Sequence, residues 1–394
     1  MNMVYFSFVD ELKRPGYKIK IHSQVRAMAE YFSNVFLFAL NGKNLIIYKI
    51  GKKSVVVKEI CIADGRIMRK RNPFDEYRIL KKALNELSAF VDSRQIDFVY
   101  FRRIVPITPL LLKCIRSLRR RNIYVAYEYP TYPWKKEMIV TGKIPLLVVD
   151  LLFYRRIIKV VDQLVVLGKY NGNIEKVTET MNGVDVEMYP MSKIDNKGGI
   201  IRFIAVGHIM PQHGYDRLIR GIADYYGNGG KNVFLNIVGP EDGKTNLKIL
   251  AKKLKVDKYI RFWGFQQGSK LDKIFDESDI GVDWLAQNKI HNNAILGSLK
   301  SREYLARGLP LIYAGNLDFV SRMGISKDFL IKVEGGTDTV DIKQIIEKYN
   351  QINTSSKAIR EFARENLGWH RMMEPVVKKF LKEGQNKFSD SKHI

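Results

Sequence analysis

The sequence contains few of the residues and patterns that mark several large classes of protein. Only two of its 394 residues are cysteines, Cys61 and Cys114, which excludes a disulfide framework and a cysteine-based zinc site. Its longest apolar run, from Ile144 to Tyr154, is interrupted by Asp150 and is far shorter than the roughly 20 residues that cross a bilayer. The first residues lack the basic segment and long apolar core of a signal peptide. We therefore expect a cytoplasmic protein that is soluble or peripheral on the inner face of the membrane.

Three ligand-binding motifs are also absent. Neither half contains the G-x-G-x-x-G fingerprint, followed by an acidic residue about 20 positions later, that marks nicotinamide-dependent oxidoreductases. The G-x-x-x-x-G-K-[ST] phosphate-binding loop is missing as well. No two aspartates stand two positions apart, so there is no D-x-D triplet to hold a metal ion on a diphosphate. We therefore expect no metal and no cofactor, and a nicotinamide-dependent oxidoreductase is kept as an alternative enzyme.

Acidic residues are scarce, and the formal net charge is +25. Residues 101–160 alone contain 13 Lys/Arg and 3 Asp/Glu, a composition that attracts nucleic acid, anionic lipid or phosphate-bearing substrates. A non-catalytic nucleic-acid-binding protein is a second alternative, but no nucleic-acid-binding module is present. We expect an anionic membrane surface as the partner, because residues 145–154 place apolar side chains beside Arg155, Arg156 and Lys159. A solvated basic face and an ordinary core helix would explain the same residues.

Short β-rich runs alternate with helical patterns along the whole chain, which is typical of parallel α/β architecture. A polar, glycine-containing stretch at residues 189–199 predicts a boundary between two domains, residues 1–190 and 200–368. Residues 369–394 are expected to form a helix and a polar tail that pack back on the first domain. The fold class is therefore α/β, with two facing Rossmann-like domains and a cleft between them. We expect ligands to bind in this cleft, because open parallel sheets bind ligands outside the carboxyl ends of their strands.

One segment of the second domain has the composition of an anion site. A helix predicted over residues 299–306 and the residue that follows it place Lys300, Glu303 and Arg307 on one face, because these residues are three and four positions apart. In the functional interpretation, Lys300 and the start of the helix bind a diphosphate, and Glu303 accepts hydrogen bonds from ribose hydroxyls. In the structural interpretation, Glu303 and Arg307 form an ordinary surface ion pair.

Several segments of the second half, taken together and in order, resemble glycosyltransferase family 4, the retaining family with the two-domain type B fold. They are Gly207–Leu218, Ile237–Pro240, Ile260–Phe265, Ser278–Val282 and Glu303–Pro310. The resemblance implies that the second domain binds a nucleotide diphosphate sugar and that the first holds the acceptor. The donor-binding residues that it implies are Gly16, Gly207, His208, His213, Phe265, Gly297, Ser298, Leu299, Lys300 and Glu303.

The first half is similar to the family over shorter segments, at Met181–Asp185 and Pro15–Tyr17. Residues 127–133, together with residues 299–305, resemble a bacterial branch that makes surface polysaccharides. The resemblance implies transfer of a hexosyl group, with retention, from a UDP-sugar to a glycan or lipid-linked glycan acceptor. The pathway would be capsule, exopolysaccharide or lipopolysaccharide synthesis.

The sequence departs from the family pattern at three places. The phosphate-binding Arg and Lys of the family fall on His208 and His213, and its first Glu falls on Ile295. Its catalytic-site His has no clear counterpart, and Glu128, which stands near that place, is the candidate catalytic residue. If the two histidines carried the charge, donor affinity would fall from about pH 6 to 8.5, whereas Lys300 with an ordinary pKa predicts a flat profile.

Overall fold

The computed structural model describes residues 1–63, 72–140, 142–193, 199–241, 245–286 and 295–390. The chain divides into two compact units: unit 1 contains Met1–Met181 and the residues from Trp369 onward, and unit 2 contains Asn182–Gly368. The division therefore falls before the polar stretch at which the sequence places it. The reason is that residues 182–192 bond to unit 2: the Asn182 amide donates to the Gly297 carbonyl (2.7 Å) and the Ser192 N–H to the Arg307 carbonyl (2.9 Å).

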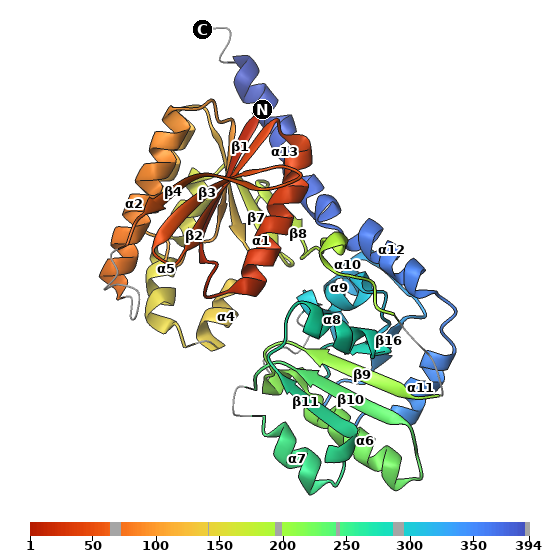
Figure 1. Ribbon diagram of the computed structural model, residues 1–394. Coiled ribbons are helices and arrows are strands. Elements are labelled where there is room, and N and C mark those ends of the chain that lie inside the picture. Colours follow the sequence, from red (N-terminus) through yellow and green to blue (C-terminus); the bar gives the residue numbers. More distant parts are fainter. Residues whose placement is uncertain (64–71, 141, 194–198, 242–244, 287–294, 391–394) are drawn as a thin grey trace. The chain divides into compact units, whose positions relative to one another are not determined.

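Unit 1 contains an eight-stranded sheet with the order β4-β3-β2-β1-β5-β6-β7-β8 (Figure 1). Six adjacent strands, β2, β1, β5, β6, β7 and β8, are parallel to one another. Strands β3 and β4 extend the sheet at one edge with antiparallel pairing. The strands are β1 (Asn2–Asp10), β2 (Asn34–Asn41), β3 (Asn44–Ile50), β4 (Val55–Cys61), β5 (Phe98–Arg102), β6 (Tyr124–Tyr129), β7 (Gln163–Leu167) and β8 (Val177–Thr180).

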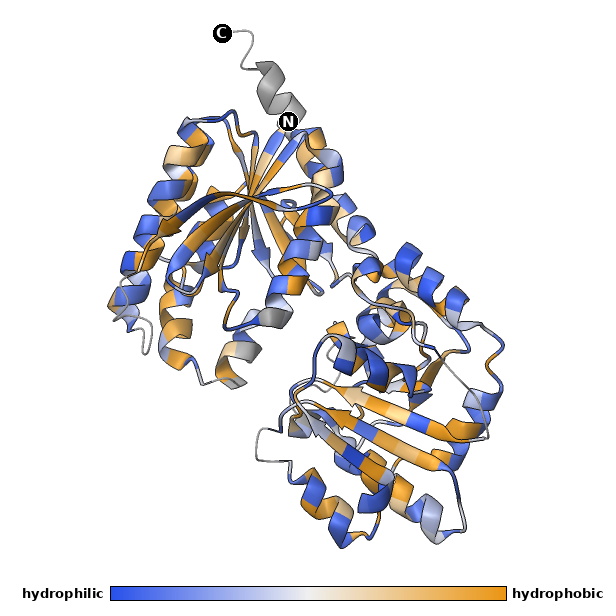
Figure 2. Ribbon diagram, in the orientation of Figure 1, coloured by the Kyte–Doolittle hydropathy of each residue, from blue (hydrophilic) through white to orange (hydrophobic). Residues whose placement is uncertain are grey.

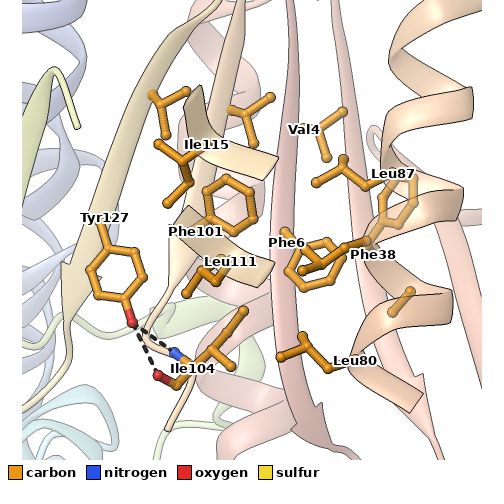
Figure 3. Packing of buried hydrophobic residues seen from close by; sticks show 14 of the residues in the cluster. Val4, Phe6, Phe38, Leu80, Leu87, Phe101, Ile104, Leu111, Ile115 and Tyr127 are labelled. Atoms are coloured by element: carbon orange, nitrogen blue, oxygen red, sulfur yellow. Dashed lines mark hydrogen bonds between the residues drawn. The ribbon is translucent and has the colours of Figure 1, made fainter. Parts of the chain in front are cut away.

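Helices cover both faces of this sheet, with α2 and α5 on one side and α1 and α13 on the other (Figure 1). They are α1 (Pro15–Met28), α2 (Pro73–Asp92), α3 (Pro109–Arg120), α4 (Trp134–Val140), α5 (Ile144–Val160) and α13 (Trp369–Asp390). The start of α3 follows from its sequence, because the Thr108 hydroxyl accepts from the Leu111 N–H (3.3 Å) and Pro109 stands at the first helical position. The core between the sheet and helices α2 and α3 is apolar. Among the residues drawn in Figure 3, the Tyr127 hydroxyl accepts a hydrogen bond from the Ile104 N–H and donates one to the Ile104 carbonyl.

Unit 2 contains a six-stranded parallel sheet with the order β11-β10-β9-β12-β14-β16. Its strands are β9 (Ile201–Val206), β10 (Val233–Val238), β11 (Ile260–Gly264), β12 (Ile280–Val282), β14 (Leu311–Ala314) and β16 (Leu330–Val333). A short pair, β13 (Ile295–Leu296) and β15 (Asn316–Leu317), lies apart from the main sheet. The helices are α6 (Tyr215–Gly227), α7 (Leu247–Lys253), α8 (Ser269–Asp276), α9 (Leu299–Ala306), α10 (Asp318–Met323), α11 (Ile342–Asn350) and α12 (Ser356–Leu367).

The strand order of unit 2 reverses between β9 and β12. In open parallel sheets, ligands bind outside the carboxyl ends of the strands at such a reversal point. Two glycines allow close approach there. A Cβ on Gly239 would lie 1.8 Å from the Gly207 carbonyl oxygen, and one on Gly281 would lie 2.4 Å from the Tyr304 ring. These contacts hold the loop after β9 against β10 and seat α9 on β12.

The prediction of an α/β chain with two Rossmann-like parallel sheets is confirmed. Within the described residues, none of the helices combines the length and the apolar character that crossing a bilayer demands.

Candidate functional site

The reversal point of unit 2 brings three chain segments together. Gly207 follows β9, Asp283 follows β12, and Lys300 lies in the first turn of α9. Gly207 has a φ of 130°, and a Cβ added to it would lie 3.4 Å from Cδ of Lys300. The stem of the lysine therefore lies against the loop after β9.

The Lys300 ammonium occupies a largely enclosed polar position. Its Nζ donates to the Tyr215 hydroxyl at 3.1 Å and lies 3.9 Å from Oδ1 of Asp283, and 17% of the side chain is exposed. Burial lowers the pKa of Lys300 to about 8, although the negative charge of Asp283 opposes this change. The side chain is therefore mostly charged at neutral pH and loses its proton near pH 8.

Asp283 is fully buried beside this lysine. Its Oδ1 accepts a hydrogen bond from the Ser298 hydroxyl (2.8 Å), whereas Oδ2 has no hydrogen-bond partner within the described ranges. Burial raises the pKa of this carboxyl group, and Lys300 counteracts that rise. Asp283 is not among the residues that the sequence predicts for the site. Its position could have indicated a role in binding, since it is the first residue after a strand at the carboxyl edge of the sheet.

The start of α9 lies open to an anion. Ser298 is its N-cap residue, but the hydroxyl is bonded to Asp283 and makes no capping bond to the helix. The first-turn N–H groups of this eight-residue helix therefore lack a side-chain cap. They carry the positive end of the helix dipole, and Lys300 adds a full charge beside them.

Arg302 fixes the direction of α9. It is 1% exposed, and its Nη2 donates to both carboxylate oxygens of Asp318, at 2.7 and 2.6 Å. Its Nε donates to the Asn182 carbonyl (2.8 Å) and its Nη1 to the Ser298 carbonyl (2.8 Å). The predicted residue Gly297 lies in the same corner, where a Cβ would approach Oδ2 of Asp318 to 3.0 Å. The sequence does not predict the role of Arg302, because Asn182 and Asp318 are 120 and 16 positions away from it in the chain.

Glu303 is held by Arg307, one turn further along the helix. Nε of Arg307 donates to Oε1 of Glu303 (3.1 Å), and its Nη1 lies 2.9 Å from Oδ1 of Asp272. The arginine is 4% exposed and the glutamate 19%, so this is not the exposed surface pair of the structural interpretation. Burial raises the pKa of Glu303, and the charge of Arg307 works against the rise. The carboxylate therefore has a fixed direction and a small exposed area.

The two histidines lie in different surroundings. His208 is exposed, whereas His213 is buried and its Nδ1 accepts from the Met210 N–H at 3.3 Å. Burial lowers the pKa of His213 to about 2, and the nearby Lys300 charge contributes. Burial therefore favours the neutral form of His213, whereas the hypothesis that it carries positive charge for a phosphate needs the protonated form. Its ring lies 5.3 Å from that of Tyr215 and so supports the residue that contacts Lys300.

The other predicted donor-site residues of unit 2 are exposed. Leu299 is 44% exposed at the first position of α9. Phe265 is 63% exposed directly after β11, two strands away from β9 in the sheet order. Neither side chain is needed to fill the core of unit 2.

The two predicted residues of unit 1 have different surroundings. Glu128 is fully buried, with Oε1 bonded to Arg102 (2.7 Å) and Oε2 to the Tyr100 hydroxyl (2.7 Å) and the Gln24 amide (2.6 Å). The carboxylate is fully buried and bonded to three side chains of unit 1, so Glu128 offers a substrate no exposed oxygen in this structure. Gly16 is exposed in the first turn of α1, with nothing within 4 Å of its Cβ position.

Comparison with solved structures identifies the architecture. Sucrose-phosphate synthase from Thermosynechococcus elongatus is similar with a TM-score of 0.68 and 12% identity, covering 97% of this chain and 98% of that one. HepE from Anabaena, solved in complex with UDP and glucose, has a TM-score of 0.59 and 12% identity, with coverage of 97% and 100%. The lipopolysaccharide outer core galactosyltransferase WaaB has a TM-score of 0.57 and 10% identity, with coverage of 96% and 100%.

Sequence comparison adds no assignment, because no family model and no curated protein matches the chain. The structural similarity extends over nearly the full length of all three proteins. The chain therefore has the two-domain α/β fold of the type B glycosyltransferases.

Proposed function

We propose that this protein is a retaining glycosyltransferase of family 4 that moves a hexosyl group from a nucleotide diphosphate sugar to a glycan or lipid-linked glycan acceptor. The observation that carries the proposal is Lys300, placed beside the uncapped start of α9 at the reversal point of the sheet in unit 2. A diphosphate has two adjacent anionic groups. One suits an ammonium group and the other suits the N–H groups of a helix start.

The remaining contacts of the donor follow from this placement. Glu303, on the same helix, would accept hydrogen bonds from the ribose hydroxyls, and the exposed Phe265 would contact the nucleobase. Gly207 would let the sugar phosphate approach the backbone after β9. A UDP-sugar is the donor that we propose, supported by the similarity to HepE, which was solved with UDP and glucose. The similarity to WaaB supports bacterial surface-polysaccharide synthesis as the pathway.

In the proposed reaction, the protein holds the two substrates in position and supplies positive charge beside the leaving group. The bond between the anomeric carbon and the diphosphate oxygen breaks, and the acceptor oxygen bonds to the same carbon from the same face. The acceptor proton passes to the departing diphosphate, since Glu128 is enclosed. Lys300 and the helix start stabilise the negative charge that develops on the leaving group.

Replacing Glu303 with glutamine is expected to weaken UDP binding about tenfold, or roughly 1.4 kcal/mol, because an amide replaces a charged acceptor. Isothermal titration calorimetry measures the change. Glu277→Gln, at an exposed position after α8, is the matched control and should bind UDP like the unaltered protein. Binding of NADH without binding of UDP would instead support the oxidoreductase, and salt-sensitive binding of DNA alone would support the nucleic-acid-binding alternative.

Transfer is expected to continue when divalent metal ions are removed, because Lys300 and the helix start supply the positive charge. The described residues contain no group of three or more His, Cys, Asp or Glu side chains arranged to hold a metal ion. The measurement is sugar transfer from a UDP-sugar, with and without excess EDTA. Activity that disappears in EDTA and returns with added Mg²⁺ or Mn²⁺ would contradict this part of the proposal.

A further inference from the structure

Helix α5 of unit 1 exposes an apolar surface on its outward side. Its inward stripe contains Leu147, Asp150 and Ile157, which are buried. The outward side chains of its first half are all apolar, and Figure 2 shows apolar colour over much of this helix. They are Ile144, Val148, Val149, Leu151 and Leu152, with exposed fractions of 46%, 55%, 37%, 42% and 66%. Single exposed apolar residues are common on protein surfaces, but five on one helix form a patch.

In the second half of α5 the most exposed side chains are cations. Arg155, Arg156 and Lys159 are exposed, and the neighbouring helix α3 exposes Lys113, Arg116 and Arg120. We call the outward surfaces of α3 and α5 together the α3–α5 face.

No acidic side chain is exposed on either helix. The sequence of α3 contains none, and the one acidic residue of α5, Asp150, is buried. Its Oδ2 accepts from Arg103 (2.9 Å) and its Oδ1 from the Ile107 N–H (2.8 Å). The charge that the α3–α5 face presents is therefore entirely positive.

The apolar and cationic parts follow one another along the axis. A helix rises about 1.5 Å per residue, so the apolar part from Ile144 to Leu152 extends about 12 Å. Helices that connect parallel strands begin at the carboxyl edge of the sheet, which places the apolar end at that edge and the cations behind it. Helix α4, which contacts α5, adds Ile139 with an exposed fraction of 56%.

We propose that the α3–α5 face docks on an anionic lipid bilayer, with the first half of α5 in the interfacial layer and the cations at the lipid phosphates. Amphipathic helices bury their apolar side chains about 5–10 Å deep in this layer, and the five exposed apolar side chains of α5 are the ones that would enter it. A second copy of the chain is a poor occupant, because its net charge of +25 would meet a cationic face. A nucleic acid would leave the five apolar side chains uncovered.

Vesicle sedimentation tests this proposal independently of the donor site, which lies in unit 2. The unaltered protein should sediment with vesicles of phosphatidylcholine mixed with phosphatidylglycerol, and binding should fall as salt rises. Arg155→Glu with Arg156→Glu should lower the partition coefficient at least about tenfold. Leu151→Ser with Leu152→Ser should lower it at constant charge. Lys252→Glu with Lys253→Glu, exposed on α7, reverses the same number of charges elsewhere and should have a much smaller effect.

Each variant is also checked for UDP affinity and melting temperature, so that a loss of vesicle binding is not mistaken for unfolding. Equal binding to pure phosphatidylcholine vesicles would overturn the proposal, as would unchanged binding by both α5 variants. A switch from dimer to monomer in the leucine variant, with vesicle binding retained, would instead assign the apolar surface to a second copy. Failure of UDP to bind would refute the donor site and leave the vesicle result unaffected.

Discussion

Replacing Lys300 with glutamine is expected to weaken the binding of a UDP-sugar about 100-fold, because charge-assisted hydrogen bonds contribute roughly 1.5–3 kcal/mol. Its Nζ is held by the Tyr215 hydroxyl at 3.1 Å and lies 3.9 Å from Asp283, so little side-chain freedom is lost when a diphosphate binds. Calorimetry with UDP-glucose gives the affinity. Lys252→Gln, at an exposed position on α7, is the matched control and should be unaffected.

The same lysine predicts how donor affinity depends on pH. Its pKa is about 8 without ligand, and a bound diphosphate raises it because the anion favours the charged form. Below pH 8 the lysine is charged in both states, and affinity is constant. Above pH 8 the free protein loses the proton that the complex keeps, so affinity falls as pH rises. This expectation differs from the flat profile up to pH 8.5 that an ordinary lysine pKa would give.

Three variants assign this pH dependence. Lys300→Gln should abolish the decline above pH 8, and His213→Gln should leave it unchanged because His213 is already neutral. The diphosphate of UDP-glucose stays fully ionised over this range, so it does not contribute. A decline between pH 6 and 7 that disappears in His208→Gln would assign the phosphate charge to His208 and contradict the role of Lys300.

Replacing Arg302 with methionine is expected to lower the unfolding free energy of unit 2 by about 3–5 kcal/mol, because a buried carboxylate loses its partner. Asp318 is 4% exposed and receives both of its short charged contacts from this arginine. The carbonyls of Asn182 and Ser298 lose donors in the same change. Hydrogen exchange of unit 2 peptides measures the loss without a contribution from unit 1.

The double variant Arg302→Met with Asp318→Leu separates the ion pair from general packing. Removing both charges should recover part of the stability, since no unpaired buried charge remains. Arg220→Met, at an exposed position on α6, is the control and should change stability by less than about 0.5 kcal/mol. Equal losses in Arg220→Met and Arg302→Met would refute the assignment.

Parts of the fold can be predicted from the sequence where the local pattern of apolar residues is strong. Helix α9 has the bounds that the sequence predicts, because helical spacing and a clear end, at Gly308 and Pro310, are present in that segment. Strand β4 has no comparable signal in its sequence. It lies at the sheet edge with most of its side chains exposed, so burial leaves no pattern in its sequence, and its pairing with β3 defines it.

The candidate site divides in the same way. The sequence by itself determined that Lys300 and Glu303 share a helix face and that Gly207 follows a strand, because these are matters of spacing along the chain. Only the tertiary structure decided that Asp283 and Tyr215 contact Lys300, that His213 is buried, and that Arg102 bonds to the buried Glu128. Burial and the distance to residues far away in the chain set the charge and accessibility of a side chain, and both arise only when the chain folds.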